Sequence, residues 1–92
     1  MIGREPTVYN KTMTLADTEY SQQLASGTCK YLIQCRGDYD IKLAFVSGAS
    51  ATNYITIRAG QTYYEDGIDD GRTLYFQCAT AAQVAEIIAW EA

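Results

Sequence analysis

The residues with the clearest capacity for chemistry form a short acidic segment at positions 65–70, where Glu65, Asp66, Asp69 and Asp70 fall within six residues. Carboxylate oxygens on a flexible loop are ligands that Ca²⁺ prefers in proteins. The spacing differs from that of an EF-hand loop, and no glutamate stands at its closing position. We therefore predict a solvated acidic turn between two strands, with a cation site as the alternative, and no metal or cofactor.

Other catalytic groups are scarce. Histidine is absent from the 92 residues, which excludes Ser-His-Asp and Cys-His catalysis as well as histidine metal clusters. Carboxylate pairs such as Asp38 and Asp40 remain, but nothing sets them in a pocket, and so small a domain has little room for one. A net charge of −4 argues against nucleic acid, whose binding requires cations to displace counterions from phosphate. The chain is predicted to be no enzyme and no nucleic-acid binder.

Eight tyrosines are many for this length. Tyrosine is enriched at protein interfaces because it offers a rigid contact area with a polar tip, although strands favour it too. Both interpretations stay open. Adjacent strand residues cannot both face the core, so Tyr63 and Tyr64 are the pair better suited to an interface. Near the C-terminus, Ile88 and Trp90 form an apolar pair suited to a neighbouring surface.

These residues are positioned by short segments between regularly spaced turns. Turn signals recur at Ser26-Gly27, Gly37-Asp38, Ser47-Gly48, Ala59-Gly60 and Asp66-Gly67. Between them apolar and polar residues alternate, as in Cys29–Arg36, where Leu32 is the exception. Period two is that of a strand, and turns at this spacing are typical of a sandwich or barrel. The prediction is all-β: a single small antiparallel β-sandwich of about 7–8 short strands.

The inward-facing residues of the later strands should be Ile55, Ile57, Leu74, Phe76 and Cys78. The loop Ser47–Asn53 consists of small residues and is expected to be mobile. Residues 79–92 have helical propensity, but we predict a strand over Val84–Glu91. Such a strand is apolar on both faces, so it either lies between two layers or is covered by a partner.

The N-terminal residues show little periodicity and contain Gly3 and Pro6. We predict an extended arm over residues 1–11 and a sandwich domain over residues 12–92. Arg4 and Lys11 would bring positive charge to this arm. It could add a strand to the open edge of a neighbouring sheet.

The compartment is inferred from what the chain lacks. No apolar stretch approaches the roughly 18 residues of a membrane helix, and the N-terminus has no apolar signal region. We expect no membrane association and folding in a reducing cytosol. Cys29, Cys35 and Cys78 are predicted to be small buried thiols. The first two would lie about 20 Å apart on one strand face, beyond the reach of a disulfide.

Five segments carry a resemblance to known proteins. They are Thr12–Gln22, Tyr31–Arg36, Tyr54–Gly60, Thr73–Gln77 and Val84–Ile87. Together they resemble small β-sandwich structural proteins of tailed bacteriophages, of the decoration or head-completion type. The resemblance lies in strand-and-turn texture and includes no catalytic motif.

The resemblance implies a virion structural protein made in the cytoplasm of the host bacterium. Its expected role is capsid decoration and stabilisation, with the major capsid protein as partner and a homo-oligomeric state. The alternatives are a head–tail joining protein and a tail, fibre or carbohydrate-adhesion module. The predicted partner interface comprises Arg4, Tyr9, Lys11, Tyr63, Tyr64, Ile88 and Trp90.

Overall fold

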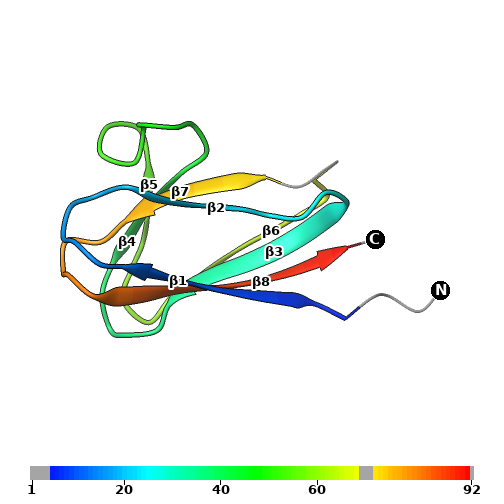
Figure 1. Ribbon diagram of the computed structural model, residues 1–92, viewed down its shortest axis with the longest axis horizontal. Coiled ribbons are helices and arrows are strands. Elements are labelled where there is room, and N and C mark those ends of the chain that lie inside the picture. The colour runs from blue at the N-terminus through cyan, green and yellow to red at the C-terminus, as the bar shows by residue number, and fades with distance from the viewer. Residues whose placement is uncertain (1–4, 69–71, 92) are drawn as a thin grey trace.

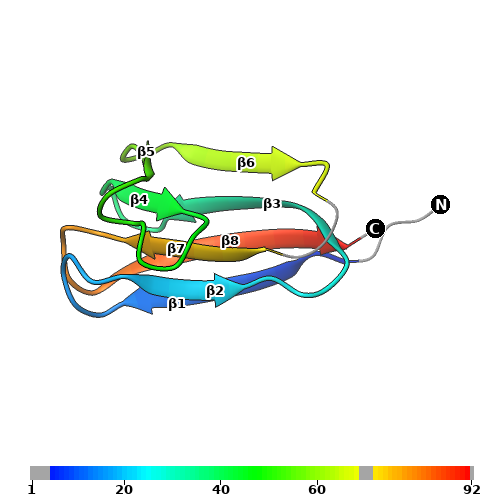
Figure 2. The same ribbon diagram turned by 90° about the horizontal axis from the view of Figure 1, so that it is seen from above.

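The computed structural model describes residues 5–68 and 72–91, which form eight strands. In chain order they are β1 (Thr7–Met13), β2 (Tyr20–Gln23), β3 (Thr28–Cys35), β4 (Ile41–Ala44), β5 (Ile55–Ile57), β6 (Thr62–Asp66), β7 (Thr73–Gln77) and β8 (Gln83–Glu91). The strands make two four-stranded antiparallel sheets, ordered β1-β8-β3-β6 and β2-β7-β4-β5. Seen from above, the second sheet lies over the first (Figure 2). The predicted all-β sandwich is confirmed.

The core lies between the sheets and follows from the alternation in the sequence. In β3, Tyr31 and Ile33 are fully buried, and in β8 Ala85 and Ile87 are buried as well. Each pair of facing residues on neighbouring strands shares a side of the sheet, so β3 and β8 present one continuous apolar surface to the second sheet. Burying such surface stabilises the fold by about 25 cal/mol per Å².

The first strand differs from the sequence prediction. Residues 7–11 are not an arm, because they belong to β1, which pairs with β8 from Thr7 opposite Ala89 to Met13 opposite Gln83. Strand β1 does not alternate clearly in the sequence, because its outward side carries the apolar Val8 and its inward side carries the charged Lys11. Its inner side carries Met13, which is fully buried. Residues 1–4 of the predicted arm lie outside the described residues.

The C-terminal segment is a strand, as predicted. β8 lies between β1 and β3 in the sheet. Ala85, Ile87 and Ala89 on its inner face are buried, whereas Ile88 and Trp90 on its outer face are half-buried. Among the predicted inward residues, Ile57, Leu74, Phe76 and Cys78 are buried. Ile55 lies opposite buried Leu43 and therefore faces inward as predicted, but it is 41% exposed. It lies in β5, a three-residue edge strand paired only with β4 in its sheet.

The loop between β4 and β5 folds over the outer side of sheet β2-β7-β4-β5 (Figures 1 and 2). The Glu19 carboxylate accepts hydrogen bonds from the backbone N–H groups of Gly48 (2.8 Å) and Ser50 (3.1 Å) and from the Ser50 hydroxyl (2.6 Å). Gln77 of β7 donates its amide to Ser50 Oγ at 2.8 Å. These bonds anchor a loop whose small residues predicted mobility. We call this outer side the covered face.

Candidate functional site

The outer side of sheet β1-β8-β3-β6, here called the open face, carries a row of apolar side chains. The strand register places Val8 opposite Ile88, Ile88 opposite Leu32, and Leu32 opposite Tyr64. Val8 is 61% exposed and Tyr64 49% exposed, while Leu32 and Ile88 are half-buried. Because neighbouring strands lie about 4.8 Å apart, the row is continuous across all four strands.

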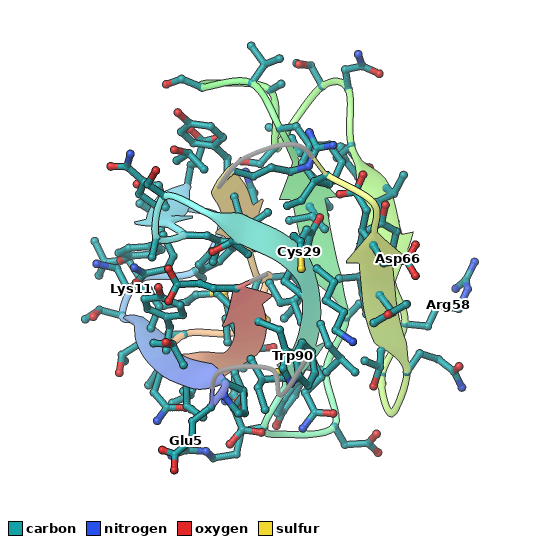
Figure 3. The ribbon with its side chains drawn as sticks, turned by 90° about the vertical axis from the view of Figure 1, so that its right-hand side faces the viewer. Glu5, Lys11, Cys29, Arg58, Asp66 and Trp90 are labelled. Carbon is teal, nitrogen blue, oxygen red and sulfur yellow. The ribbon has the colours of Figure 1, made fainter. Side chains whose placement is uncertain are left out.

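One side of the apolar row is bordered by Trp90, Lys30 and Asp66. Lys30 of β3 lies opposite both Trp90 of β8 and Asp66 of β6. Its Nζ stands 5.2 Å from the centre of the Trp90 ring, a cation–π contact. Figure 3 shows Trp90 and Asp66 at the same end of the sheet. The indole therefore extends the apolar row toward this end.

The other side of the row is bordered by a polar network around Glu86. Arg36 donates from Nε to Glu86 Oε2 at 2.8 Å, and Gln34 donates from Nε2 to Glu86 Oε1 at 3.0 Å. The hydrogen bond from Arg36, aided by that from Gln34, holds the pKa of Glu86 below its ordinary value. Glu86 is thus ionised and paired at neutral pH.

The strands of the open face balance their charges. Lys30 and Arg36 are basic and Asp66 and Glu86 are acidic, so this side of the sheet is close to neutral. The whole chain carries −4. The acidic surplus therefore lies elsewhere on the molecule, and a protein surface approaching the open face meets no strong local field.

A shallow depression follows part of the apolar row. It measures about 240 Å³ and is lined by Val8, Asn10, Leu32, Gln34, Glu86, Ile87 and Ile88. The lining combines aliphatic side chains with amide and carboxylate groups. This chemistry suits an apolar side chain of another protein whose neighbours can form hydrogen bonds at the edge.

Three residues of the predicted interface meet on the open face: Tyr64 from β6, and Ile88 and Trp90 from β8. The sequence had suggested them separately, and the pairing of β8 and β6 with β3 brings them together. Two further members of the row were missed. Leu32 was visible as the break in the alternation of β3, whereas Val8 was hidden in the segment predicted as an arm.

The other predicted interface residues lie elsewhere. Tyr63 faces inward, and its ring centre is 6.2 Å from that of Tyr31. Tyr9 also packs against the core, and its hydroxyl accepts a hydrogen bond from the Ala25 N–H at 3.2 Å. Lys11 shares the inner side of β1 with Tyr9, since it lies opposite buried Ala85. Figure 3 shows it on the β1 side, away from Trp90. Arg4 lies outside the described residues.

Glu65, the first residue of the acidic segment, forms hydrogen bonds within the fold. Tyr31 donates its hydroxyl to Glu65 Oε1 at 2.8 Å, and Arg72 donates from Nη2 to Glu65 Oε2 at 2.9 Å. Burial and the neighbouring Glu65 carboxylate raise the pKa of Tyr31 well above its ordinary value. The Arg72 guanidinium also lies over the Phe45 ring, 5.4 Å from its centre. This carboxylate is therefore engaged within the fold.

Asp66, the next residue, faces the opposite way. It lies on the open face and accepts a hydrogen bond from the Tyr64 hydroxyl at 3.4 Å. Asp69 and Asp70 lie outside the described residues, so the alternative of a cation site stays open for them. Within residues 5–68 and 72–91, no three acidic or cysteine side chains gather as metal ligands would.

The remaining carboxylate pair and the hollows nearby show structural contacts. Asp40 Oδ1 accepts a hydrogen bond from the Ala59 N–H at 2.7 Å. A hollow of about 300 Å³ lies beside Asp38, Asp40 and Cys78. A second, of about 560 Å³, is lined by residues 55–59 and 61–63, whose ionisable side chains are Arg58 and Tyr63. Neither lining pairs an acid with a base in a way that suggests proton transfer.

The cysteines are free thiols. Cys78 is buried as predicted, but Cys29 and Cys35 are only half-buried. Cys29 lies at a register shift between Thr28 and Lys30, which turns it away from the core. Its Sγ contacts the Trp90 carbonyl oxygen at 3.4 Å. Burial raises the pKa of the Cys35 thiol.

In the part of the chain that the structure describes, no helix is long and apolar enough to span a membrane. Comparisons with protein-family models, with curated proteins and with solved structures found no match to this chain.

Proposed function

We propose that this chain is a non-enzymatic structural protein that acts by binding protein surfaces through its open face. The observation that carries this proposal is the apolar row of Val8, Ile88, Leu32 and Tyr64, which crosses all four strands without cover from the described chain. Contiguous exposed apolar side chains bordered by polar groups are typical of interaction sites. Trp90 beside the row adds the kind of aromatic anchor that dominates binding energy at interfaces.

The non-enzymatic part of the proposal is supported by the use that the fold makes of its carboxylates. Glu19 anchors a loop, Glu65 pairs with Tyr31 and Arg72, and Glu86 pairs with Arg36. A general acid or base needs a carboxyl group aimed into a site that holds substrate. These side chains instead stabilise the sandwich.

The more specific proposal is a virion component that decorates or stabilises a phage capsid, and it is supported by the sequence resemblance. A lattice of identical subunits offers the same site many times, so weak individual contacts add up to strong attachment. A broad, shallow face without a deep pocket suits that mode of binding. Head–tail joining or tail attachment would use the same face on a different partner.

The test is co-sedimentation with undecorated capsids, comparing the wild-type chain with two matched variants. Val8→Glu places a charge in the apolar row. Val46→Glu makes the same change at an equally exposed valine in the β4–β5 loop, 68% exposed against 61% for Val8. We expect Val8→Glu alone to abolish particle binding.

Equal binding by both variants would refute the open face as the docking site. No binding of the wild-type chain to capsids would refute decoration. Binding of the isolated chain to glycans would instead support the adhesion alternative.

A further inference from the structure

We infer that the open face binds a second copy of this chain, face to face, around a two-fold axis parallel to the strands and passing between β8 and β3. This inference rests on the proposed function, because it names a partner for the same face. A two-fold contact uses one surface twice, so that surface must complement itself. The open face meets this requirement in polarity and in charge.

The apolar row is self-complementary under this axis. The axis lays β8 of one copy over β3 of the other, and β1 over β6. Ile88 then meets Leu32 of the second copy, and Val8 meets its Tyr64. Two sheets packed in this way lie about 10 Å apart, the usual spacing at which facing side chains interdigitate. Four apolar residues from each copy would be buried from water in this contact.

The charges favour this axis over a two-fold axis that runs along the apolar row. Around the proposed axis, Trp90 meets Lys30 of the second copy and Glu86 meets its Gln34, so no charge faces its like. A two-fold axis running along the apolar row would instead place Trp90 over Glu86 of the second copy. The face of an aromatic ring is negative, which favours an ammonium group and disfavours a carboxylate. The near-neutral face also spares the pair the repulsion expected of two chains that each carry −4.

The size of the face sets the expected strength. Four strands about 4.8 Å apart, with about seven residues at roughly 3.3 Å each, make a face of roughly 19 by 23 Å. The corresponding contact falls below the roughly 800 Å² per partner of a standard interface. We therefore expect a weak, reversible dimer.

Analytical ultracentrifugation over a range of protein concentrations tests the association. The wild-type chain should shift from monomer to dimer as its concentration rises. Val8→Glu should raise the dissociation constant at least about tenfold, because it buries an unpaired charge. The matched change Val46→Glu should leave it within about twofold. A wild-type chain that stays monomeric, or equal effects of the two variants, would overturn the inference.

Cysteine cross-linking tests the axis. Ile88→Cys and Leu32→Cys variants are oxidised separately and as a mixture, with the wild-type chain as the control for its native thiols. We expect disulfide-linked dimers only in the mixture, because each variant carries one of the two cysteines and the axis places position 88 of one copy over position 32 of the other. Dimers of Ile88→Cys with itself would place the axis along the row and overturn the proposed arrangement.

The two proposals can fail separately. A chain that is monomeric throughout but binds capsids in a Val8-dependent way would refute the self-association and support the proposed docking function. A chain that dimerises but never binds particles would do the reverse.

Discussion

The two outer faces of the sandwich are built from strands of the same kind but differ in what lies over them. On the covered face the β4–β5 loop lies over the sheet, leaving Ala44 2%, Ser50 1% and Gln77 5% exposed (Figure 1). On the open face, Val8 and Tyr64 are 61% and 49% exposed. The loop that covers one side has no counterpart among the described residues on the other.

The difference separates two uses of a sheet surface. Polar groups on the covered face are satisfied internally, by the hydrogen bonds that join Glu19, Ser50 and Gln77. Burial there is completed by the chain itself. The open face instead carries apolar side chains in one row, with the Lys30–Trp90 cation–π contact on one side and the Arg36–Glu86 ion pair on the other. The folded monomer tolerates such a surface in water, but covering it with another apolar surface lowers the free energy.

The largest expected effect compares the core with the open face through the same substitution. Leu74 is 0% exposed, so Leu74→Ala should lower the free energy of unfolding by about 2–5 kcal/mol. Leu32→Ala, in the apolar row, should cost about 1 kcal/mol or less in the monomer. Urea unfolding followed by far-ultraviolet circular dichroism measures both. Equal losses would mean that Leu32 belongs to the core and that the open face is not a free surface.

The next largest effect on stability is expected for the β4–β5 loop that lies over the covered face. Glu19→Ala removes the acceptor of three hydrogen bonds to Gly48 and Ser50, so the free energy of unfolding should fall by about 1–2 kcal/mol. Amide exchange should accelerate at these two residues. Glu5→Ala, at the exposed start of the described chain, is the control and should change little. Unaltered exchange at Ser50 would contradict an anchored loop.

Alkaline pH should weaken the core through Tyr31. Its pKa is raised in the folded protein from the ordinary value of 10.0, so the unfolded chain loses this proton first. Stability from Tyr31 is therefore complete below that value and falls as pH rises above it, by about 1.4 kcal/mol per pH unit. Unfolding of Tyr31→Phe should depend less steeply on pH. An identical slope would assign the loss to other groups, such as Tyr63, whose pKa is also raised.

The smallest effect on stability is expected at Trp90. Trp90→Ala should lower the free energy of unfolding by only about 1 kcal/mol, yet weaken assembly clearly, because the ring lies beside the apolar row. Tyr54→Ala is the matched control. Lys42 Nζ lies 5.0 Å from the Tyr54 ring centre, as Lys30 Nζ lies 5.2 Å from that of Trp90, but off the open face. A Trp90 variant that assembles normally and melts far lower would show Trp90 to be part of the core.

The fold was predictable where the alternation of residues was clear. Strand β3 could be predicted from Tyr31 and Ile33, and the buried face of β8 from the alternation of Ala85, Ile87 and Ala89. Strand β1 was missed because Val8 on its outward side and Lys11 on its inward side break the alternation. The exposure of Ile55 was not predictable, because sequence alternation gives the side of a strand but not its distance from the sheet edge.

For the candidate site, the sequence determined which residue types were present and which alternated: the surplus of tyrosines, the exception at Leu32, and the outward pair Ile88 and Trp90. Only the tertiary structure decided that Val8, Ile88, Leu32 and Tyr64 share one row, and that the β4–β5 loop covers the other face. The physical reason is that register joins strands far apart in the chain, from β1 to β8 and from β3 to β6. Local periodicity sets the direction of each side chain, whereas long-range pairing and the cover from loops decide what lies beside it and whether water reaches it.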